Sequence, residues 1–482
     1  MNRNNPHYDL IVIGGGAAGE KGAAQAAYFG KKVAMIESSK KLGGATAGTT
    51  VPSKTLRETS LILTGYQARK LHKVDLLLDK QATVQDFLHH EKNVKSAEQD
   101  RAQSNMLRHG VDVIRGLGNF TGKNSVQVLQ EDGNRMDLTA DIILVATGSR
   151  PRRPDNFPKS KFIYDSDTIL EIEKIPQNMI VIGGGVIGCE YACIFRAIGV
   201  EVHLINSRDE LLPFLDKDIG KRLTKSMIKM GIEILNNENV ESCKATEEGI
   251  TISLESGQFF KTDAVMLATG RNSNTDKLNL ESANIQTGKY GLLIVDENYQ
   301  VIHPETKELV QGVYACGDVI GAPALASTSM EQARFAMIQA FNLDRYKSTV
   351  APILPVGIYT IPECSGAGKS EEDCIREKIP YVIGKAYYNQ NARGLIIGDT
   401  EGLLKLIFTY DDETKNPLRL IGVHVVGEIA SELVHTGLTA LMLHATHEVF
   451  INMCFNYPTL GELYKYATYD AMGRRNKSIK KN

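Results

Sequence analysis

Residues 9–19 read DLIVIGGGAAG, an apolar stretch that runs directly into three glycines and, after two alanines, a fourth. A helix is expected over residues 23–30, and residues 32–37 read KVAMIE, a second apolar strand. Strand, glycine-rich turn, helix and strand are the plan of a dinucleotide-binding βαβ unit. The glycines allow a tight turn and close approach to a pyrophosphate, and the helix N-terminus offers free N–H groups. The stretch therefore predicts a dinucleotide site, whose motif glycines are Gly14, Gly16 and Gly19.

The same plan occurs again further along the chain. Residues 178–188 read NMIVIGGGVIG, a helix is expected over 189–198, and residues 201–206 read EVHLIN. Each copy later reaches an apolar strand that ends in Ala-Thr-Gly, at Gly148 in the first copy and Gly270 in the second. One glycine motif is weak evidence, but two copies in the required strand–turn–helix context predict two dinucleotide sites. The motif glycines of the second copy are Gly183, Gly185 and Gly188.

The two copies differ at the end of their second strand, where an acidic residue ordinarily binds the ribose hydroxyls. The first copy has Glu37 there, and its carboxylate accepts hydrogen bonds from a free 2′-OH and repels a 2′-phosphate. The second copy has the uncharged Asn206, followed by Arg208, whose guanidinium suits a 2′-phosphate. We therefore expect an adenine dinucleotide with a free ribose at the first site. The second is expected to accept NADP as well as NAD; the alternative for Arg208 is an ordinary surface arginine.

The composition excludes several classes of protein. The 482 residues carry a net charge of −2, which gives no electrostatic case for binding nucleic acid or an anionic membrane. No apolar run reaches the roughly 18 residues of a membrane span, and no signal-peptide pattern is present. Seven cysteines without framework spacing indicate free thiols in a reducing compartment, the cytoplasm. His444 and His447 lack the H-E-x-x-H pattern, so no metal site is predicted.

The rest of the chain adds three features. Residues 55–109 are an insertion in the first unit that is polar and nearly free of Gly and Pro, so long helices are expected there. Residues 344–351 are expected to form a linker, followed by alternating strands such as LLKLIF at 403–408 and then two helices. The basic tail 474–482 is expected to be a frayed terminus, with a binding arm as the alternative.

The two glycine motifs, GVYACGD at residues 312–318 and the C-terminal α/β region together resemble the flavoprotein pyridine nucleotide–disulfide oxidoreductases. Glutathione reductase and dihydrolipoamide dehydrogenase belong to this family, and the resemblance covers roughly residues 8–470. It implies that the first unit binds FAD, with Asp318 on the ribityl chain, and that the second binds NAD(P)H. It also implies a homodimer, or a larger homo-oligomer, formed through the last domain.

The expected fold class is α/β, with two Rossmann-like FAD/NAD(P)-binding domains and a C-terminal α+β dimerisation domain. The expected boundaries are 1–154 for the first part of the FAD-binding domain, 155–275 for the NAD(P)-binding domain, 276–350 for the second, central part of the FAD-binding domain, 351–470 for the dimerisation domain and 471–482 for the basic tail.

The chain departs from the family at both places that handle thiols. Residues 42–54 read LGGATAGTTVPSK, so the two cysteine positions of the family are occupied by Ala45 and Thr50. Neither side chain can form a disulfide or a thiolate. The family's His-Pro-x-x-x-Glu motif reads Tyr-Pro-Thr-Leu-Gly-Glu, with Tyr457 in the position of the histidine. A phenol with an ordinary pKa near 10 is a poor proton donor to a departing thiolate at neutral pH.

The nucleotide half of the family's site is retained. Lys54 follows Pro-Ser, and Glu190 lies two residues after Gly188. By the resemblance these two residues pair beside the flavin, where an ammonium favours the anionic reduced ring and the arrival of hydride. A purely structural buried ion pair is the alternative.

Within the family, the chain resembles the transhydrogenase group, in which hydride passes from NADPH to NAD⁺ through FAD by successive binding at one site. Two alternatives stay open: a reductase that passes electrons to a quinone, a dye or O₂, and a protein that binds FAD without catalysis. The candidate catalytic residues are Lys54 and Glu190. The candidate cofactor-binding residues are Gly14, Gly16, Gly19, Glu37, Thr50, Lys54, Gly148, Gly183, Gly185, Gly188, Asn206, Arg208, Gly270, Gly317 and Asp318.

Overall fold

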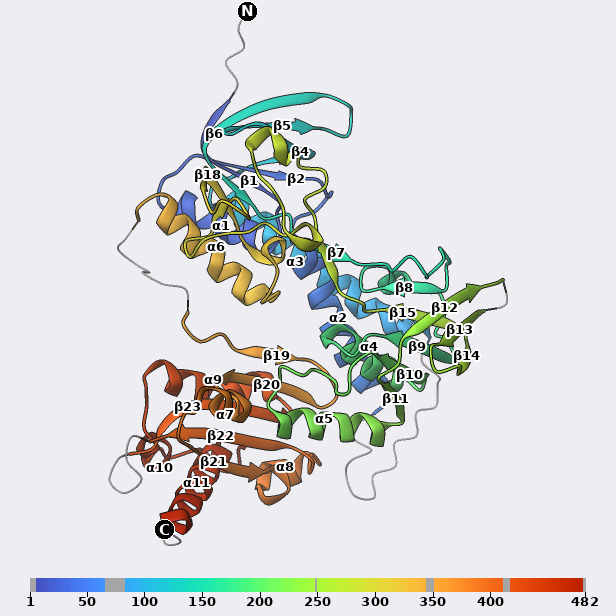
Figure 1. Ribbon diagram of the computed structural model, residues 1–482, viewed down its shortest axis with the longest axis vertical. Helices are drawn as coiled ribbons and strands as arrows, with labels where there is room; N and C mark the ends of the chain where they lie inside the picture. The colour runs from blue at the N-terminus through green and yellow to red at the C-terminus, as the bar shows by residue number, and fades with distance from the viewer. Residues whose placement is uncertain (1–5, 66–82, 248, 344–350, 411–416, 480–482) are drawn as a thin grey trace, which may run out of the picture. The chain divides into compact units, whose positions relative to one another are not determined.

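The computed structural model of the chain describes residues 6–65, 83–247, 249–343, 351–410 and 417–479. The contacts divide the chain into two compact units. Figure 1 labels the helices and strands and colours the chain by residue number. Unit 1 comprises Met1–Pro52, His89–Arg152 and Gly270–Ala351, and unit 2 comprises Ser53–Leu88, Arg153–Thr269 and Pro352–Asn482. Unit 2 therefore holds both the second glycine motif and the C-terminal region. The finer domain boundaries stay a prediction.

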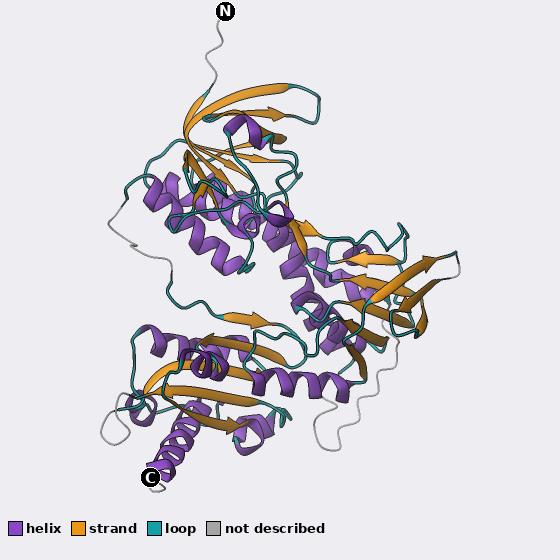
Figure 2. Ribbon diagram, viewed as in Figure 1, coloured by secondary structure: helices purple, strands orange, loops and turns teal. Residues whose placement is uncertain are grey.

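Unit 1 is built on a largely parallel sheet (Figure 2). Its strands are β1 (His7–Ile13), β2 (Val33–Glu37), β3 (Asp112–Arg115), β4 (Leu117–Gly122), β5 (Ser125–Leu129), β6 (Arg135–Val145), β17 (Gln300–Ile302) and β18 (Leu309–Ala315). The main path runs β17-β18-β6-β1-β2-β3, and the antiparallel pair β4 and β5 joins the sheet at β6. The glycine motif therefore follows a central strand, because β1 lies between β6 and β2.

Side chains from β1 pack on both faces of this sheet. Leu10 and Val12 belong to the core that includes residues of helices α1 (Ala17–Tyr28) and α6 (Ala326–Ala340). Ile11 and Ile13 belong to the core on the other face, which includes residues of β4 and β5. Successive side chains of a strand point to opposite faces, so a strand covered on both faces needs apolar residues throughout. This is the physical reason why residues 10–13 show no polar alternation.

The nucleotide-binding part of unit 2 repeats this plan. Its strands are β8 (Ile163–Asp165), β9 (Asn178–Ile182), β10 (Glu201–Asn206), β11 (Ile232–Asn236) and β15 (Ala264–Leu267). They form a parallel sheet in the order β11-β10-β9-β15-β8. Helix α4 (Val186–Ala197) follows the glycine motif and α5 (Lys217–Met230) precedes β11. A separate antiparallel sheet consists of β12 (Val240–Ala245), β13 (Ile250–Leu254) and β14 (Phe259–Thr262).

The C-terminal part of unit 2 is an antiparallel sheet with helices (Figure 2). Its strands are β19 (Val356–Ile358), β20 (Glu363–Gly368), β21 (Tyr381–Tyr387), β22 (Leu403–Thr409) and β23 (Arg419–Gly427), in the order β19-β20-β23-β22-β21. The helices are α7 (Glu371–Glu377), α8 (Ala392–Ile396), α9 (Ala430–Met442), α10 (Glu448–Asn452) and α11 (Leu463–Ile479). The fold class predicted from the sequence is confirmed.

Two details of this C-terminal part correct the sequence-based expectation. Three helices follow β23 where two were predicted, because the short α10 precedes α11. Helix α11 also continues to Ile479, so the predicted frayed end is wrong for residues 474–479. Arg474 pairs with Asp470 one turn earlier at 2.8 Å, and the Arg475 guanidinium lies 5.1 Å from the centre of the Tyr410 ring. These contacts hold the basic turn in helical form.

The predicted helical insertion is confirmed where the structure describes it. It contains most of α2 (Val51–Leu63) and all of α3 (Val84–Arg108). Residues 66–82 of the insertion and residues 344–350 of the predicted linker lie outside the described residues. No helix in the described ranges combines the length and apolar character that crossing a bilayer requires.

Candidate functional site

The first glycine motif has the close approaches that a dinucleotide turn requires. Gly14 has a φ of +106°, and a Cβ there would lie 2.4 Å from the Ala146 carbonyl oxygen. A Cβ on Gly19 would lie 1.8 Å from the Gly14 carbonyl oxygen. Helix α1 begins after Gly16, and no side chain caps its N-terminus. The first N–H groups of the helix therefore stay available for an anion such as a pyrophosphate.

The second glycine motif reproduces this geometry in unit 2. Gly183 has a φ of +113°, and its Cβ would lie 2.4 Å from the Ala268 carbonyl oxygen. A Cβ on Gly188 would lie 1.8 Å from the Gly183 carbonyl oxygen, whereas Gly185 has open space within 4 Å of its Cβ position. That open space lies at the uncapped N-terminus of α4. Both motifs thus fit the phosphates of a dinucleotide.

Glu37 holds the first turn with both oxygens of its carboxylate. The buried side chain accepts hydrogen bonds from the backbone N–H of Gly15 at 2.7 Å and of Ser39 at 2.7 Å. A carboxylate has further lone pairs for ribose hydroxyls. Glu37 therefore lies where the sequence predicts it, at the end of β2 and beside the glycine turn.

Asn206 occupies the equivalent position in the second unit, but its side chain donates hydrogen bonds where that of Glu37 accepts them. Its buried Nδ2 donates to the carbonyl oxygens of Arg208 and Glu210, each at 3.1 Å, and to Asn236 Oδ1 at 2.9 Å. The amide thus folds the following turn back onto β10 and leaves the Arg208 side chain exposed. Sequence reasoning foresaw the missing negative charge but not this role in shaping the turn.

The two Ala-Thr-Gly motifs lead into a pair of short strands in unit 1. Strand β7 (Ser149–Pro151) follows Gly148, strand β16 (Arg271–Ser273) follows Gly270, and the two strands pair antiparallel. Ser149 Oγ donates to Asp318 Oδ2 at 2.9 Å and accepts from Arg271 Nε at 2.7 Å. This chain of hydrogen bonds orients the half-buried Asp318.

Sequence reasoning missed Ser149 and Arg271. The available signal was their position, because each directly follows an Ala-Thr-Gly motif. Gly317, the neighbour of Asp318, has a φ of +82°, a backbone conformation that favours glycine, and donates its N–H to Gln332 at 2.9 Å.

Lys54 and Glu190 meet in unit 2 as predicted, although 136 positions separate them in the chain. Lys54 Nζ lies 2.6 Å from Glu190 Oε2, and the side chains are 27% and 4% exposed respectively. The other Glu190 oxygen accepts the backbone N–H of Tyr359 at 2.9 Å, and Lys54 Nζ lies 5.1 Å from the centre of the Tyr359 ring. The result is a buried carboxylate that anchors a partly accessible ammonium. Tyr359 carried no signal in the sequence.

The positions that correspond to the family's thiols contain no sulfur. Ala45 and Thr50 are exposed, and Thr46–Thr50 is a π-helical turn directly before α2. Tyr457 is 76% exposed. All seven cysteines are free thiols and only Cys454 is exposed. Burial raises the pKa of Cys193 to about 12, so this thiol, near Glu190 on α4, stays protonated at neutral pH.

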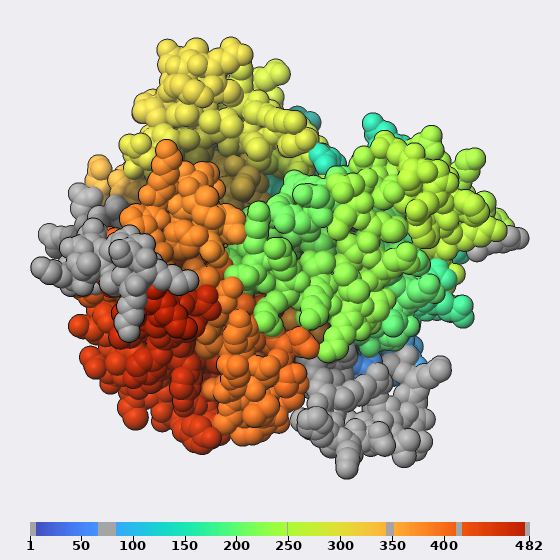
Figure 3. Space-filling view, turned by 60° about the horizontal axis from the view of Figure 1, so that its bottom comes forward, coloured from blue at the N-terminus to red at the C-terminus, as the bar shows by residue number. Residues whose placement is uncertain are grey.

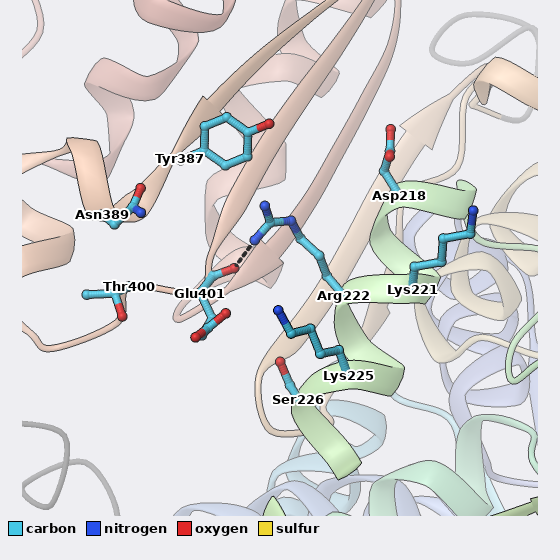
Figure 4. A pocket seen from close by; sticks show the side chains of 9 residues that line it. All are labelled: Asp218, Lys221, Arg222, Lys225, Ser226, Tyr387, Asn389, Thr400 and Glu401. Atoms are coloured by element: carbon cyan, nitrogen blue, oxygen red, sulfur yellow. Dashed lines mark hydrogen bonds between the residues drawn. The ribbon is translucent and has the colours of Figure 1, made fainter. Parts of the chain in front are cut away.

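One pocket of unit 2 contains none of the site residues predicted from the sequence. It lies between α5 and the end of β21, has a volume of about 440 Å³, and is drawn in Figure 4. Figure 3 shows this part of the surface, with the green residues of α5 against the orange C-terminal residues. Arg222 crosses it and donates to the Glu401 carbonyl oxygen at 2.8 Å. The lining residues are Asp218, Lys221, Arg222, Lys225, Ser226, Tyr387, Asn389, Thr400 and Glu401.

Comparison with known proteins agrees with this arrangement. Residues 8–333 match a family model described as pyridine nucleotide-disulphide oxidoreductase, and residues 354–468 match the dimerisation domain of that family. The chain belongs to the pyridine nucleotide-disulphide oxidoreductase family.

Relatives in this family include proteins named soluble pyridine nucleotide transhydrogenase. One from Mycobacterium bovis is 38% identical over 473 residues, which are 97% of each chain. Another from Aliivibrio fischeri is 39% identical over 475 residues, which cover 97% of this chain and 98% of that one.

The fold is also similar to that of solved structures. LpdA from Mycobacterium tuberculosis has a TM-score of 0.85 at 25% identity, with 96% of this chain and 99% of that chain covered. A flavoprotein disulfide reductase from Escherichia coli, solved as a Cu(II) complex, has a TM-score of 0.84 at 22% identity, with 97% and 99% covered. The latter likeness is one of fold alone.

Proposed function

We propose that this chain is a flavoprotein transhydrogenase that transfers hydride between NADPH and NAD⁺ through bound FAD, without a redox disulfide. One observation carries the proposal: the Lys54–Glu190 pair is formed, while the two cysteine positions hold Ala45 and Thr50. The machinery for hydride entry is thus retained in a chain that has no sulfur at the place where the family passes electrons to a disulfide. Relatives that are 38–39% identical over nearly the whole chain are named soluble pyridine nucleotide transhydrogenase, which supports the proposal.

Unit 1 supplies the groups that would hold FAD. The turn of Gly14, Gly16 and Gly19 and the free end of α1 suit the pyrophosphate, and Glu37 suits the adenosine ribose. Asp318, oriented by Ser149, has a carboxylate to accept hydrogen bonds from the ribityl hydroxyls. When bound, FAD supplies a ring that accepts hydride from one nicotinamide and returns it to another.

Unit 2 supplies the groups that would hold the nicotinamide dinucleotide. The turn of Gly183, Gly185 and Gly188 matches the first motif in its close contacts. Asn206 places no carboxylate at the ribose, and Arg208 provides a cation for a 2′-phosphate. We infer that the site takes either nucleotide, so that NADP⁺ can leave and NAD⁺ can enter in its place.

Lys54 and Glu190 have different tasks in this proposal. The Lys54 ammonium supplies a fixed positive charge for the negative charge that develops when hydride arrives, and a preorganised charge lowers the barrier more than mobile water does. Glu190, buried and held by the Tyr359 N–H, fixes the position of that ammonium. Neither residue needs to transfer a proton for hydride to pass.

Transfer between the nucleotides is the decisive test. The holoenzyme is expected to reduce thio-NAD⁺ with NADPH. Double-reciprocal plots of the initial rate against NADPH concentration, measured at several thio-NAD⁺ concentrations, should give parallel lines, because both nucleotides use one site in turn. Stopped-flow mixing of the reduced enzyme with NAD⁺ or with a quinone separates the main alternative. Reoxidation by the quinone alone, with NAD⁺ inactive, would contradict the proposal and favour a quinone reductase.

A homodimer is also proposed, through the C-terminal part of unit 2. The match to the family's dimerisation domain supports it, and so do large exposed apolar side chains in this part, among them Ile429, Met442 and Leu443.

The buried free thiols are compatible with a reducing compartment such as the cytoplasm.

Reversing the charge of Arg208 should separate the two nucleotides. In Arg208→Glu, the KM for NADPH is expected to rise about tenfold or more, since a charge-assisted pair is worth about 1.5–3 kcal/mol. The KM for NADH should change less than twofold. Lys244→Glu, the same reversal at an exposed position on β12, is the matched control. An equal rise for both nucleotides would show that Arg208 does not pair with the 2′-phosphate.

A further inference from the structure

A buried arginine lies one helical turn after Lys54. Arg57 is on the same helix, α2, and its side chain is only 2% exposed. Its Nε donates to the Thr360 carbonyl oxygen at 3.0 Å, and its Nη1 lies 3.4 Å from Glu363 Oε1. It also contacts the carboxylate of its neighbour Glu58. A buried guanidinium is costly unless it is paired. Besides its neighbour Glu58, the partners of this guanidinium are Thr360 and Glu363, which are distant in the chain.

The same short segment of chain also binds the partner of Lys54. The backbone N–H of Tyr359 donates to Glu190 at 2.9 Å, and Cys193, one turn later on α4, has its Sγ 4.0 Å from the Ile361 carbonyl oxygen. The segment 359–363 therefore contacts both helices that provide the ion pair. The Arg57 guanidinium links this segment to α2, as does the Lys54 ammonium beside the Tyr359 ring.

Helix α2, helix α4 and the segment 359–363 are joined pairwise, and we call this arrangement a three-membered ring of contacts. Helix α2 meets α4 through Lys54 and Glu190 at 2.6 Å, α4 meets the segment 359–363 through Glu190 and Tyr359, and the segment meets α2 through Thr360 and Arg57. Each side restrains the other two, since three bodies joined pairwise have little freedom to shift. Without Arg57, α2 would lose its contacts with Thr360 and Glu363, although Lys54 would still contact Glu190 and the Tyr359 ring.

The segment 359–363 belongs to the C-terminal part of unit 2 and also contacts helix α9 there. The second oxygen of Glu363 accepts the backbone N–H of Ser431 at 3.1 Å, near the start of α9. Arg57 thus connects the helix of Lys54, through the buried Glu363 carboxylate, to the start of α9.

We propose that Arg57 is a positioning residue for the Lys54 ammonium, which it fixes by tying α2 to the segment 359–363. This role rests on the proposed function, in which the Lys54 charge assists hydride transfer to FAD. A misplacement of about 1 Å in such a group can cost up to 100-fold in rate. Loss of the tie is therefore expected to lower the rate of hydride transfer while leaving nucleotide binding unchanged.

The test uses the holoenzyme and variants that separate position from stability. Arg57→Met leaves Glu363 buried and unpaired, so Arg57→Met/Glu363→Gln is the main variant, because a neutral Gln still accepts from Ser431. We expect wild-type thermal unfolding, an NADPH Kd within twofold of wild type, and flavin reduction by NADPH about tenfold slower. The midpoint potential of the bound FAD should become more negative, because a displaced ammonium stabilises the reduced ring less. A wild-type rate and a wild-type potential in this variant would overturn the proposal.

Two further variants complete the test. Arg57→Lys keeps the charge but loses the fork that reaches both Thr360 and Glu363, and an intermediate rate and potential are expected; wild-type values would overturn the proposal even if the double variant does not fold. Lys405→Met/Asp216→Asn removes a different buried ion pair of unit 2 and should leave the potential unchanged. An equal shift of the potential in this control would mean that any loosening of unit 2 has the same effect, and would also overturn the proposal.

The rate of flavin reduction by NADPH and the midpoint potential are both measured without NAD⁺. A failure of hydride transfer to NAD⁺ would therefore reject only the proposed function.

Discussion

Replacing Lys54 with Met is expected to slow hydride transfer from NADPH to the bound flavin about 100-fold, and up to 1,000-fold, the usual cost of removing one preorganised electrostatic group. The reason lies in the geometry of the pair. Glu190 is 4% exposed and holds the ammonium at 2.6 Å, so the charge does not have to be reoriented when hydride arrives. The measurement is the limiting rate of flavin bleaching in stopped-flow mixing with excess NADPH.

Three variants make this result specific. Lys54→Arg keeps a positive charge and should retain more activity than Lys54→Met. Lys54→Met/Glu190→Gln removes the unpaired buried carboxylate as well, so its rate should stay low while its thermal stability recovers. Lys244→Met, on the exposed face of β12, should behave as wild type. If Lys54→Met bleaches at the wild-type rate in an enzyme that still binds FAD, the ion pair has only a structural role.

Replacing Lys405 with Met should cause the largest loss of stability. Lys405 lies on β22 with its side chain 1% exposed, and its Nζ contacts Asp216 at 2.8 Å, Asp218 at 2.7 Å and Glu371 at 2.6 Å. Asp216 is fully buried and caps the N-terminus of α5 through the Asp218 N–H. Breaking a buried ion pair by removing one partner typically costs about 3–5 kcal/mol, because the other charge stays buried and uncompensated.

The measurement is urea unfolding followed by circular dichroism, since the chain has no tryptophan to serve as a probe. The apparent free energy of unfolding should fall by about 3–5 kcal/mol in Lys405→Met. Most of it should return in Lys405→Met/Asp216→Asn, because Asn is also a good N-cap and carries no charge. A single variant as stable as wild type would show that the carboxylates are satisfied without Lys405.

The pH dependence of this network has a defined sign. Burial raises the pKa of Asp218, but hydrogen bonds from Lys385 and Lys405 outweigh it and lower the pKa to about 2. The folded value is thus below the value of about 3.9 in the unfolded chain. Asp218 therefore contributes stability above pH 4 that is lost as the pH falls towards 2. The difference between wild type and Lys405→Met should shrink over the same range.

Much of the fold could be predicted from the sequence because its signals are local. The strands β9 and β10 have the bounds that the apolar runs at 178–182 and 201–206 indicate. The end of the chain could not be read in the same way. Residues 474–479 look like a frayed tail in sequence, but Arg475 lies over Tyr410, which is distant in the chain. That contact exists only after the sheet and α11 have packed.

The candidate site likewise has features that the sequence predicts and features that it does not. The glycine turns and the end-of-strand residues Glu37 and Asn206 follow from spacing, since a βαβ unit places them by its own geometry. Their hydrogen-bonding roles do not follow: Glu37 accepts from backbone N–H groups, whereas Asn206 donates to backbone carbonyls. The sequence shows that a charged residue in the first unit is replaced by an uncharged one in the second. Only the folded turns show that the side chain accepts hydrogen bonds in the first unit and donates them in the second.

By itself, the sequence determined that this chain has two dinucleotide motifs and, at Ala45 and Thr50, no sulfur, because those features depend only on which residue stands at which position. The tertiary structure decided which charges meet. Lys54 and Glu190 are 136 positions apart, and Arg57 and Thr360 are 303 positions apart. Burial is the reason why such residues pair, since an ion removed from water is destabilising unless it contacts an opposite charge or a hydrogen-bonding group. The choice of partner is fixed by how the helices and strands pack, which local sequence does not record.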